Sequence, residues 1–359
     1  MQLFLFMITL EGERYPGLDS NNILLTGTTN VPLARRVGEL LQTEVLGCSS
    51  RFTNMDIKTR ISESVRGRHV FILNSANFPN PDSGYMEVFF MGDAAERSSA
   101  AEITAVIPKM AYDREDRQNK FRSPISISHI FGLLKESDID RVVTFDIHSE
   151  QSAAAPIKKK DILYASYIQV PALQKIPFDN PIYVAPDDGA EDKTRAYSKM
   201  SGLGDEIVRV SKTRDLITGD TRVIGITGDV DGMEAIVVDD VISSGKTTRD
   251  VAKSLKERGA KKVVVAAAHG EFVGKWRQYL EEPWIDLVLV TDTVRPRKTV
   301  LEHPKILVYS AAPLIAHTID IIANNKQISR LHYGVATEDE LVLLNPRNKL
   351  ALAGSNGRY

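Results

Sequence analysis

The strongest chemical signal in the sequence is an apolar run that ends in two carboxylates and continues into a turn of small polar residues. Asp239 and Asp240 end the run, and a helical stretch follows the turn. The turn comprises Ser243, Ser244, Gly245, Lys246 and Thr247. Backbone N–H groups of such a turn, together with the positive end of the helix dipole, favour a phosphate. Because carboxylates accept hydrogen bonds from vicinal hydroxyls, directly or through a cation, the segment predicts a ribose-phosphate site.

Two other kinds of segment share part of this pattern. The triplet Gly245-Lys246-Thr247 also ends the phosphate loop of nucleoside triphosphatases, but that loop needs a glycine five residues before Gly245. Asp240 occupies that position, so the triphosphatase loop is excluded. An acidic strand end followed by an ordinary helix cap, formed by Ser244 or Thr247 without any ligand, stays open.

Polar residues also follow two other strand-like runs, where open α/β sheets usually bind their ligands. Asp146-Ile147-His148 ends one run, and Asp187-Asp188-Gly189 ends another. Each has a plain alternative, because a histidine at a strand end is often structural and Asp-Asp-Gly is a common turn. The charged segments Asp113–Arg117 and Lys212–Arg214 would, taken alone, be assigned to solvated surface, and Phe52 to the core.

Short β-branched runs alternate with amphipathic stretches from about Asn22 to about Asn325, which is typical of an α/β fold with parallel sheets. The expected strands are Asn22–Gly27, Glu44–Cys48, His69–Asn74, Ile103–Pro108, Arg141–His148, Pro181–Ala185, Ile207–Ser211, Ala235–Val241, Lys262–Ala268, Leu287–Thr291 and Ile306–Tyr309. The expected helices include Pro32–Gln42, Tyr85–Ala100, Ile125–Lys135, Thr247–Arg258 and Pro313–Asn324.

A break in this periodicity near Gln151–Tyr164 predicts a domain boundary, with the charge run at Lys158–Asp161 as a solvated linker. We therefore divide the chain into an N-terminal α/β domain (1–155), a C-terminal ribose-phosphate-binding α/β domain (156–335) and a tail (336–359). The tail ends in small residues and glycine from about Asn345, which predicts mobility.

Composition limits the functional classes. The 359 residues are 43% apolar and 26% charged with a formal net charge of -2, so a globular protein without general attraction to nucleic acid is expected. The single cysteine, Cys48, suits a reducing cytoplasm. No run reaches the roughly 20 apolar residues that span a bilayer, so we expect no membrane segment and interpret Leu3–Leu10 as a strand.

The carboxylate and phosphate-turn segment resembles the ribose-phosphate motif of phosphoribosyltransferases and of ribose-phosphate diphosphokinases. Arg97–Pro108, Tyr112–Arg117, Ser123–Ser126 and Asp146–His148 occur in the order and spacing of the diphosphokinases. The resemblance covers roughly Thr26 to Arg330 and identifies the chain as a divergent member of the diphosphokinase family. It implies two similar phosphoribosyltransferase-type domains, each a mainly parallel sheet flanked by helices.

The resemblance also implies an ATP site in the N-terminal domain. The residues implied there are Phe52, Asn54, Asp56, Arg114, Glu115 and Arg117. The family's aromatic residue stacks on adenine across a subunit interface, so a homo-oligomer is expected. Three positions depart from the family, which usually has glutamine where this chain has Glu115, and other acidic residues at Asn54 and Asp56.

The implied reaction is transfer of the β,γ-diphosphate of ATP to the anomeric hydroxyl of ribose 5-phosphate, giving phosphoribosyl pyrophosphate and AMP. The resemblance assigns Mg²⁺ to His148 and Asp187. It assigns catalysis to Lys212, Arg214 and His148, with both cations in a mobile loop. Residues i and i+2 of an extended chain point the same way, so both cations can reach one transferring group.

Other functions stay open. Family members commonly read Asp-Thr-Gly-Gly-Thr in the phosphate turn, whereas Ser243 and Lys246 here make the turn more positive. An acceptor with more phosphate, such as ADP-ribose in NAD synthesis or salvage, is therefore an alternative to ribose 5-phosphate. A phosphoribosyltransferase and a catalytically weak regulatory paralogue are further alternatives.

Overall fold

The buried β-branched runs form two parallel sheets, each in its own unit of the chain, which confirms the predicted α/β class. The computed structural model describes residues 17–118, 121–148, 157, 159–214, 221–326, 336–338 and 340–346. Unit 1 comprises Met1–Tyr164, Thr293–Arg295 and Ala311–Glu340. Unit 2 comprises Ala165–Asp292, Pro296–Ser310 and Leu341–Tyr359.

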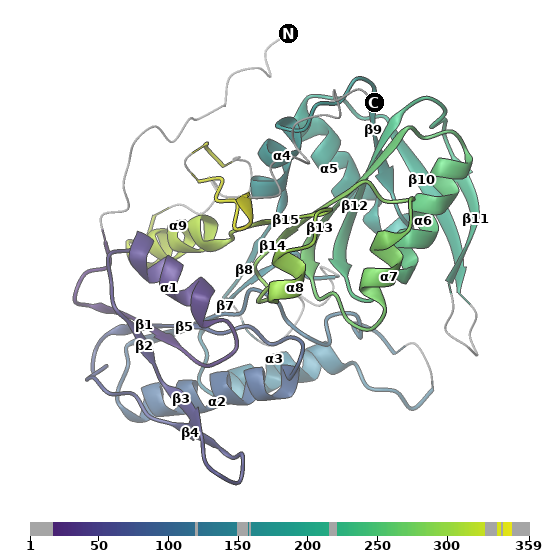
Figure 1. The fold of residues 1–359 in the computed structure, drawn as a ribbon. Coiled ribbons are helices and arrows are strands. Elements are labelled where there is room, and N and C mark those ends of the chain that lie inside the picture. Colours follow the sequence, from purple (N-terminus) through teal and green to yellow (C-terminus); the bar gives the residue numbers. More distant parts are fainter. Residues whose placement is uncertain are drawn as a thin grey trace. The chain divides into compact units, whose positions relative to one another are not determined.

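Unit 1 contains a six-stranded parallel sheet in the order β2-β1-β5-β6-β7-β8 (Figure 1). Its strands are β1 (Asn22–Thr26), β2 (Val45–Gly47), β5 (His69–Leu73), β6 (Glu102–Val106), β7 (Arg141–Phe145) and β8 (Lys159–Leu163). Helices α1 (Val31–Leu40) and α9 (Ala312–Ala323) cover one face, and α2 (Pro81–Arg97) and α3 (Ser126–Glu136) cover the other. A short antiparallel hairpin, β3 (Ser49–Arg51) and β4 (Ile57–Thr59), lies against α2.

The central strands of unit 1 are apolar on both faces because helices cover both. Ile23 and Leu25 of β1 belong to the core cluster that includes Val88 and Met91 of α2. Leu24 between them is also fully buried and points the other way, as alternation along a strand requires. This pattern is what made the parallel strands recognisable in the sequence.

Strand β8 corrects the linker predicted at Lys158–Asp161, because Lys159–Leu163 pair with β7 in parallel. Its charges are those of an edge strand with partners on neighbouring strands. Lys159 Nζ lies 2.9 Å from Glu102 Oε1, and Asp161 Oδ2 lies 2.5 Å from Arg141 Nη1. A charged edge strand discourages pairing with another chain.

Unit 2 contains a seven-stranded sheet in the order β11-β10-β9-β12-β13-β14-β15, parallel except for the antiparallel pair β10–β11. The strands are β9 (Pro181–Ala185), β10 (Ile207–Arg214), β11 (Thr221–Thr227), β12 (Glu234–Ile242), β13 (Lys262–Gly270), β14 (Leu287–Thr291) and β15 (Ile306–Tyr309). The helices are α4 (Ser166–Gln174), α5 (Glu191–Ser201), α6 (Lys246–Glu257), α7 (Trp276–Glu281) and α8 (Lys298–Leu301). The core cluster beneath α6, α7 and α8 includes Val237 and Val265 of the central strands.

The C-terminal part of the chain is not divided between the two units in sequence order, because Ala311–Glu340 belong to unit 1. Helix α9 packs against α1 and counts with unit 1. The mobile tail predicted from about Asn345 is wrong for Asn345 itself, which is buried. Its amide donates to the carbonyls of Leu301 and Ile306 and accepts from the Val308 N–H, so it binds the edge strand β15. Residues 347–359 and the strand expected at Leu3–Leu10 lie outside the described residues.

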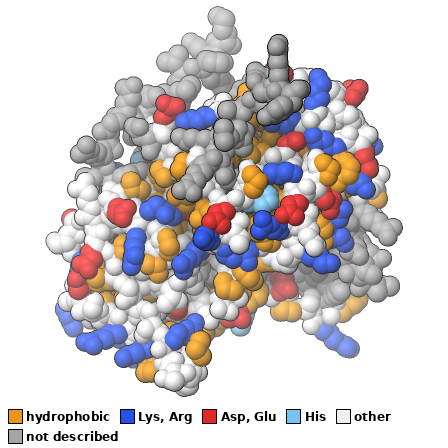
Figure 2. Space-filling view, in the orientation of Figure 1, with side chains coloured by type: hydrophobic (Ala, Val, Ile, Leu, Met, Phe, Trp, Pro, Cys, Tyr) orange, Lys and Arg blue, Asp and Glu red, His pale blue; other side chains and the backbone are white. Residues whose placement is uncertain are grey.

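Side chains of both charge signs are interspersed on the face shown in Figure 2, in keeping with a formal net charge near zero. Among the described residues, no helix has the length and hydropathy that a bilayer crossing requires.

A buried carboxylate joins α2 to the loop after β1. Glu87, 1% exposed, accepts hydrogen bonds from the N–H and hydroxyl of Thr28 and from the Asn74 amide, at 2.6–3.1 Å. A Cβ atom on Gly27 would lie 2.2 Å from Glu87 Oε2, so only glycine fits beside this group. The carboxylate thus fixes the carboxyl end of β1.

Substituting Glu87 tests this connection. Glu87→Ala removes a buried carboxylate that accepts from the Thr28 N–H and hydroxyl and from the buried Asn74 amide, so we expect the free energy of unfolding to fall by about 2–4 kcal/mol. Urea-induced unfolding measures it. Glu96→Ala removes an exposed glutamate from the same helix and should cost less than about 0.5 kcal/mol. Equal losses for the two variants would contradict the assigned role.

Candidate active site

Three neighbouring strands of unit 2 bring four of the predicted site residues to one edge of the sheet. β9 pairs in parallel with β10 on one side and with β12 on the other. Asp187 follows β9, Lys212 lies in β10, and Asp239 and Asp240 lie in the second half of β12. Lys212 Nζ is 3.4 Å from Asp187 Oδ2. The charges of Asp187 and Lys212 both influence the pKa of Asp239, so the four side chains form one electrostatic group.

The Asp239 carboxyl is strongly perturbed. Burial raises its pKa from 3.8 to about 8, the neighbouring charge of Asp240 and a hydrogen bond to it add to the rise, and Lys212 opposes it. The residue keeps some accessible area, but the carboxyl lies among protein atoms, so desolvation is the leading cause. A ligand that supplies hydroxyl donors or positive charge would offset both effects.

The predicted phosphate turn lies between β12 and α6, as expected. Gly245 has φ 79° and ψ -2°, a left-handed conformation in which a residue with a side chain is strained, and α6 begins at Lys246. The Gly245 carbonyl accepts from Arg249 N at 2.9 Å, and the Ser243 carbonyl accepts from Val273 N at 2.9 Å. Ser244 Oγ lies 3.4 Å from Lys246 N, which is a weak cap. The turn therefore places the N-terminus of α6, where backbone N–H groups and the helix dipole favour an anion, close behind Asp239 and Asp240.

Asp187 combines a structural contact with an outward one. Oδ1 accepts from the Ala190 N–H at 3.2 Å and caps the 3-10 helix Asp188–Ala190, as the plain-turn interpretation requires. Oδ2 faces Lys212 instead. The Asp187 side chain is 48% exposed, whereas that of Lys212 is only 9% exposed. The aspartate is therefore held in place and still open to a ligand.

Lys212 and Arg214 belong to a longer strand than the sequence predicted. The expected strand ended at Ser211, but β10 continues through Arg214, and its pairing with β11 shifts register between Ser211 and Lys212. Both residues thus have extended backbone, as the shared orientation of their side chains requires. The side chain of Arg214 lies outside the described part of the structure, and so do residues 215–220.

The hairpin tip of unit 1 carries Phe52, Asn54 and Asp56. The Asn54 amide donates to Asp56 Oδ2 at 2.6 Å and its oxygen accepts from the Asp56 N–H at 3.2 Å, so the two side chains shape the tip. Phe52 is 50% exposed, with Lys58 Nζ 5.6 Å from the ring centre. The core interpretation of Phe52 is therefore wrong, and its ring is available for stacking.

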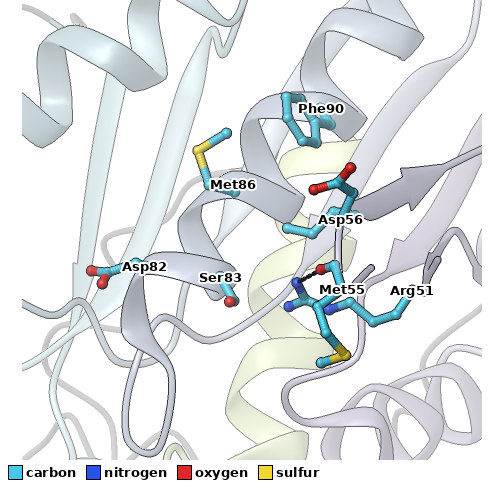
Figure 3. A pocket seen from close by; sticks show the side chains of 8 residues that line it. Arg51, Met55, Asp56, Asp82, Ser83, Met86 and Phe90 are labelled. Carbon is cyan, nitrogen blue, oxygen red and sulfur yellow. Dashed lines mark hydrogen bonds between the residues drawn. The ribbon is translucent and has the colours of Figure 1, made fainter. Parts of the chain in front are cut away.

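A pocket of about 380 Å³ lies between this hairpin and α2 (Figure 3). Its lining residues are Arg51, Met55, Asp56, Ile57, Asp82, Ser83, Met86 and Phe90. Among these residues only Asp56 is a predicted site residue. Met86 and Phe90 carry a signal that was available in the sequence, because they are spaced i, i+4 on α2. Their side chains are 38% and 40% exposed on a helix whose other face is buried.

The remaining predicted residues of unit 1 follow two other strands. Arg114, Glu115 and Arg117 are exposed in the segment after β6, where the Glu115 carboxylate accepts from the Ser126 hydroxyl. His148 is exposed after β7. Two residues earlier the backbone of Asp146 has φ 37°, a strained value for a residue other than glycine. The predicted ATP and histidine positions thus come from three separate segments of unit 1.

The described residues include no group of three or more histidine, cysteine, aspartate or glutamate side chains that would hold a metal ion alone. The donor set near Lys212 nevertheless suits Mg²⁺, because this ion prefers oxygen ligands and is often bound by one or two carboxylates plus substrate phosphates. The half-exposed Asp187 fits that description.

Two sequence-family models match the chain. The model of the N-terminal domain of ribose phosphate pyrophosphokinase matches residues 22–137, and the model of the phosphoribosyl synthetase-associated domain matches residues 179–333. The chain belongs to the ribose-phosphate pyrophosphokinase family. A ribose-phosphate pyrophosphokinase of Vibrio parahaemolyticus is 34% identical over 86% of this chain and 98% of its own length. One of Campylobacter jejuni is 36% identical over the same shares. The crystal structure of phosphoribosylpyrophosphate synthetase from Mycobacterium smegmatis has a TM-score of 0.79 at 32% identity, covering 85% of this chain and 99% of that one.

Membership in the ribose-phosphate pyrophosphokinase family agrees with the resemblance found in the sequence. The first matched range contains the hairpin and the Arg114 segment. The second contains Asp187, Lys212 and the phosphate turn. Both clusters of predicted site residues therefore lie in segments shared with the family.

The raised pKa of Asp239 makes the stability of the ligand-free protein depend on pH. Between about pH 4 and about pH 8 the folded state holds a proton that the unfolded state releases, so the free energy of unfolding should fall as pH rises, by up to about 1.4 kcal/mol per pH unit. Asp239→Asn should reduce that fall. Urea unfolding at several pH values measures it.

A matched control for this test is Asp205→Asn, which removes an aspartate whose side chain is 63% exposed in the same unit. It should leave the pH dependence unchanged. If Asp239→Asn shows the wild-type fall, the Asp239 carboxyl titrates normally and the electrostatic grouping described above is wrong.

Proposed function

We propose that the chain transfers the β,γ-diphosphate of ATP to the anomeric hydroxyl of ribose 5-phosphate, forming phosphoribosyl pyrophosphate and AMP. The observation that carries the proposal is the grouping of Asp187, Lys212, Asp239 and Asp240 beside the glycine turn at the N-terminus of α6. The curated relatives named ribose-phosphate pyrophosphokinase support it, because the chain covers nearly their whole length.

The acceptor sugar would lie against β12 and α6. Amides of Ser244 to Thr247 would hold the 5-phosphate, with Ser243 and the other turn hydroxyls as additional donors. Asp239 and Asp240 would accept from the two vicinal ribose hydroxyls. Asp239 and Asp240 lie in the strand, before the turn. The carboxylates would therefore stay apart from the phosphate, while the carboxylates and the turn would contact the same ribose phosphate.

The transfer itself forms a bond from the anomeric oxygen to the β-phosphorus and breaks the bond between that phosphorus and the oxygen that leaves with AMP. The hydroxyl proton goes to solvent. Such transfers depend mainly on positioning and on neutralising charge spread over phosphate oxygens. Lys212 suits that role because its ammonium lies 3.4 Å from Asp187 and influences Asp239, and Arg214 and His148 would add further hydrogen-bond donors.

Mg²⁺ is the metal that the half-exposed Asp187 carboxylate favours, and the family resemblance assigns His148 as a second ligand. When bound, it would neutralise the phosphate oxygens and hold them in position. The hydrogen bond that Asp187 Oδ1 accepts from the Ala190 N–H holds the carboxylate in place, and the side chain as a whole stays 48% exposed.

ATP would bind in unit 1, with Arg114 and Arg117 on its phosphates, Phe52 on adenine, and Asn54, Asp56 and Glu115 as polar neighbours. The half-exposed ring of Phe52, together with the exposed Met86 and Phe90 in the pocket beside the hairpin tip, supports a homo-oligomer in which this hairpin completes the ATP site of another subunit. The single, buried cysteine supports a reducing, cytoplasmic setting.

A second acceptor is favoured by one observation. Lys246 is the first residue of α6 and adds a positive charge at the phosphate turn. An acceptor with an extended 5-phosphate, such as ADP-ribose, would use that charge. The reaction would otherwise be the same and would still release AMP.

Lys212→Ala tests the transfer role. Removing the ammonium should lower kcat by about a hundredfold or more and change the dissociation constant of ATP by less than about threefold, because the charge matters most in the transition state. Steady-state AMP release and calorimetric ATP titration measure the two. Lys199→Ala, which removes a lysine that is 56% exposed in the same unit, is the control and should match wild type. Unchanged turnover in Lys212→Ala would remove the role.

Incubation of the purified chain with ATP, Mg²⁺ and one acceptor separates the candidate functions. AMP formed with ribose 5-phosphate supports the proposal, and a higher kcat/KM with ADP-ribose would favour the second acceptor. We expect Lys246→Gly to weaken the binding of an extended acceptor more than it weakens the binding of ribose 5-phosphate. AMP with neither acceptor would contradict both and would favour a phosphoribosyltransferase or a regulatory protein.

A further inference from the structure

A buried ion pair precedes the predicted ATP residues of unit 1. Lys109 Nζ lies 2.6 Å from Asp113 Oδ2, and the two side chains are 4% and 6% exposed. Lys109 follows the end of β6, and Asp113 directly precedes the exposed Arg114. A fully buried pair of charges thus lies next to a residue that we assign to ATP.

This ion pair is hard to explain as a source of stability. Taking both charges out of water costs much of what their attraction returns, and well-packed apolar residues of similar volume often stabilise a protein equally well or better. A buried pair differs from an apolar contact in its directionality, since the ammonium and the carboxylate must meet at hydrogen-bonding distance. The pair therefore restricts the conformation of the five residues that it spans.

The rest of the segment is held equally firmly. The buried Tyr85 hydroxyl of α2 donates to the Ala111 carbonyl at 2.8 Å, and the Ala76 N–H donates to the Lys109 carbonyl at 3.0 Å. Besides burial, the negative charge of Asp113 raises the pKa of Tyr85, which places the carboxylate near that phenol. Tyr112 reaches Asp82 of α2 through its hydroxyl.

The backbone inside this segment is strained. Tyr112 has φ 65°, the left-handed region, and its carbonyl accepts from the Glu115 N–H at 3.0 Å. A residue with a side chain stays in that region only when its surroundings determine the conformation. The strained turn lies between Asp113 and the buried Tyr85 contact, and Arg114 emerges from it.

We propose that the Lys109–Asp113 ion pair is a positioning device for Arg114, which sets the direction in which the guanidinium leaves the turn and so the geometry of its contact with the ATP phosphates. The inference rests on the proposed ATP-binding role of Arg114. It assigns Lys109 and Asp113 to positioning, not to contact with ATP.

Asp113→Asn keeps the shape of the side chain and removes its charge. With the full-length chain, we expect ATP affinity measured by calorimetry to fall about tenfold, whereas ribose 5-phosphate affinity stays unchanged because that site lies in unit 2. The double variant Arg114→Ala with Asp113→Asn should bind ATP no more weakly than Arg114→Ala alone, because the pair acts only through Arg114. Additive losses, or an Asp113→Asn variant with wild-type ATP affinity, would overturn the proposal.

A second variant separates positioning from folding. Lys109→Met with Asp113→Leu replaces the ion pair by an apolar pair, and should keep or regain the wild-type melting temperature while ATP binding stays about tenfold weaker. If the double variant had both the wild-type melting temperature and the wild-type ATP affinity, the ion pair would have a structural role only and the inference would be rejected. This variant also decides the matter if Asp113→Asn does not fold.

The matched control is Asp93→Asn, which breaks an exposed ion pair of the same i, i+4 spacing with Arg97 in the same unit. It should change neither ATP affinity nor melting temperature. AMP release by the wild-type chain is measured separately, so absence of transfer would reject the proposed reaction. The affinity comparison would still decide the role of the ion pair.

Discussion

The parallel pairing of β9 with β10 and with β12 is the constraint on which the candidate site depends. Parallel strands end at one edge of a sheet, so residues far apart in the sequence meet there. The pairing registers Arg209 with Ala185 and Val237 with Val184, which sets Lys212, Asp187 and Asp239 just beyond the paired section. The proximity of Lys212 to Asp187 follows from this register, since 25 residues separate them in the chain.

Burial on both faces explains which elements could be predicted. Strands β9, β14 and β15 have the expected bounds because each is a short apolar run between polar or turn residues. Strand β8 was missed because its Lys159 and Asp161 carry the charges of an edge, and helix α4 because Pro171 interrupts its pattern. Packing of α9 on unit 1 has no local signal, because the chain must first fold to bring α9 against α1.

The residue types of the candidate site are visible in the sequence, whereas its electrostatics are not. Adjacent carboxylates followed by a small polar turn predict a ribose-phosphate site, because the chemistry of both groups is local. The raised pKa of Asp239 depends on burial and on Asp187 and Lys212, which no local pattern reveals. The ion pair of Lys109 with Asp113 is similar, because its spacing is visible in the sequence and its burial is not.

Negative charge at the end of β12 and positive charge at the start of α6 lie within a few residues of each other. Asp239 and Asp240 place two carboxyl groups side by side, and the negative charge of Asp240, which helps to raise the pKa of Asp239, would repel a phosphate placed beside it. The left-handed turn at Gly245 directs the chain away from the strand and presents backbone amides and the positive end of α6, with Lys246 at its first position. The positive charge of Lys212, which lies 3.4 Å from Asp187, opposes the rise in the pKa of Asp239. A sugar with hydroxyls at one end and a phosphate at the other matches this division of charge, which a ligand of uniform charge would not.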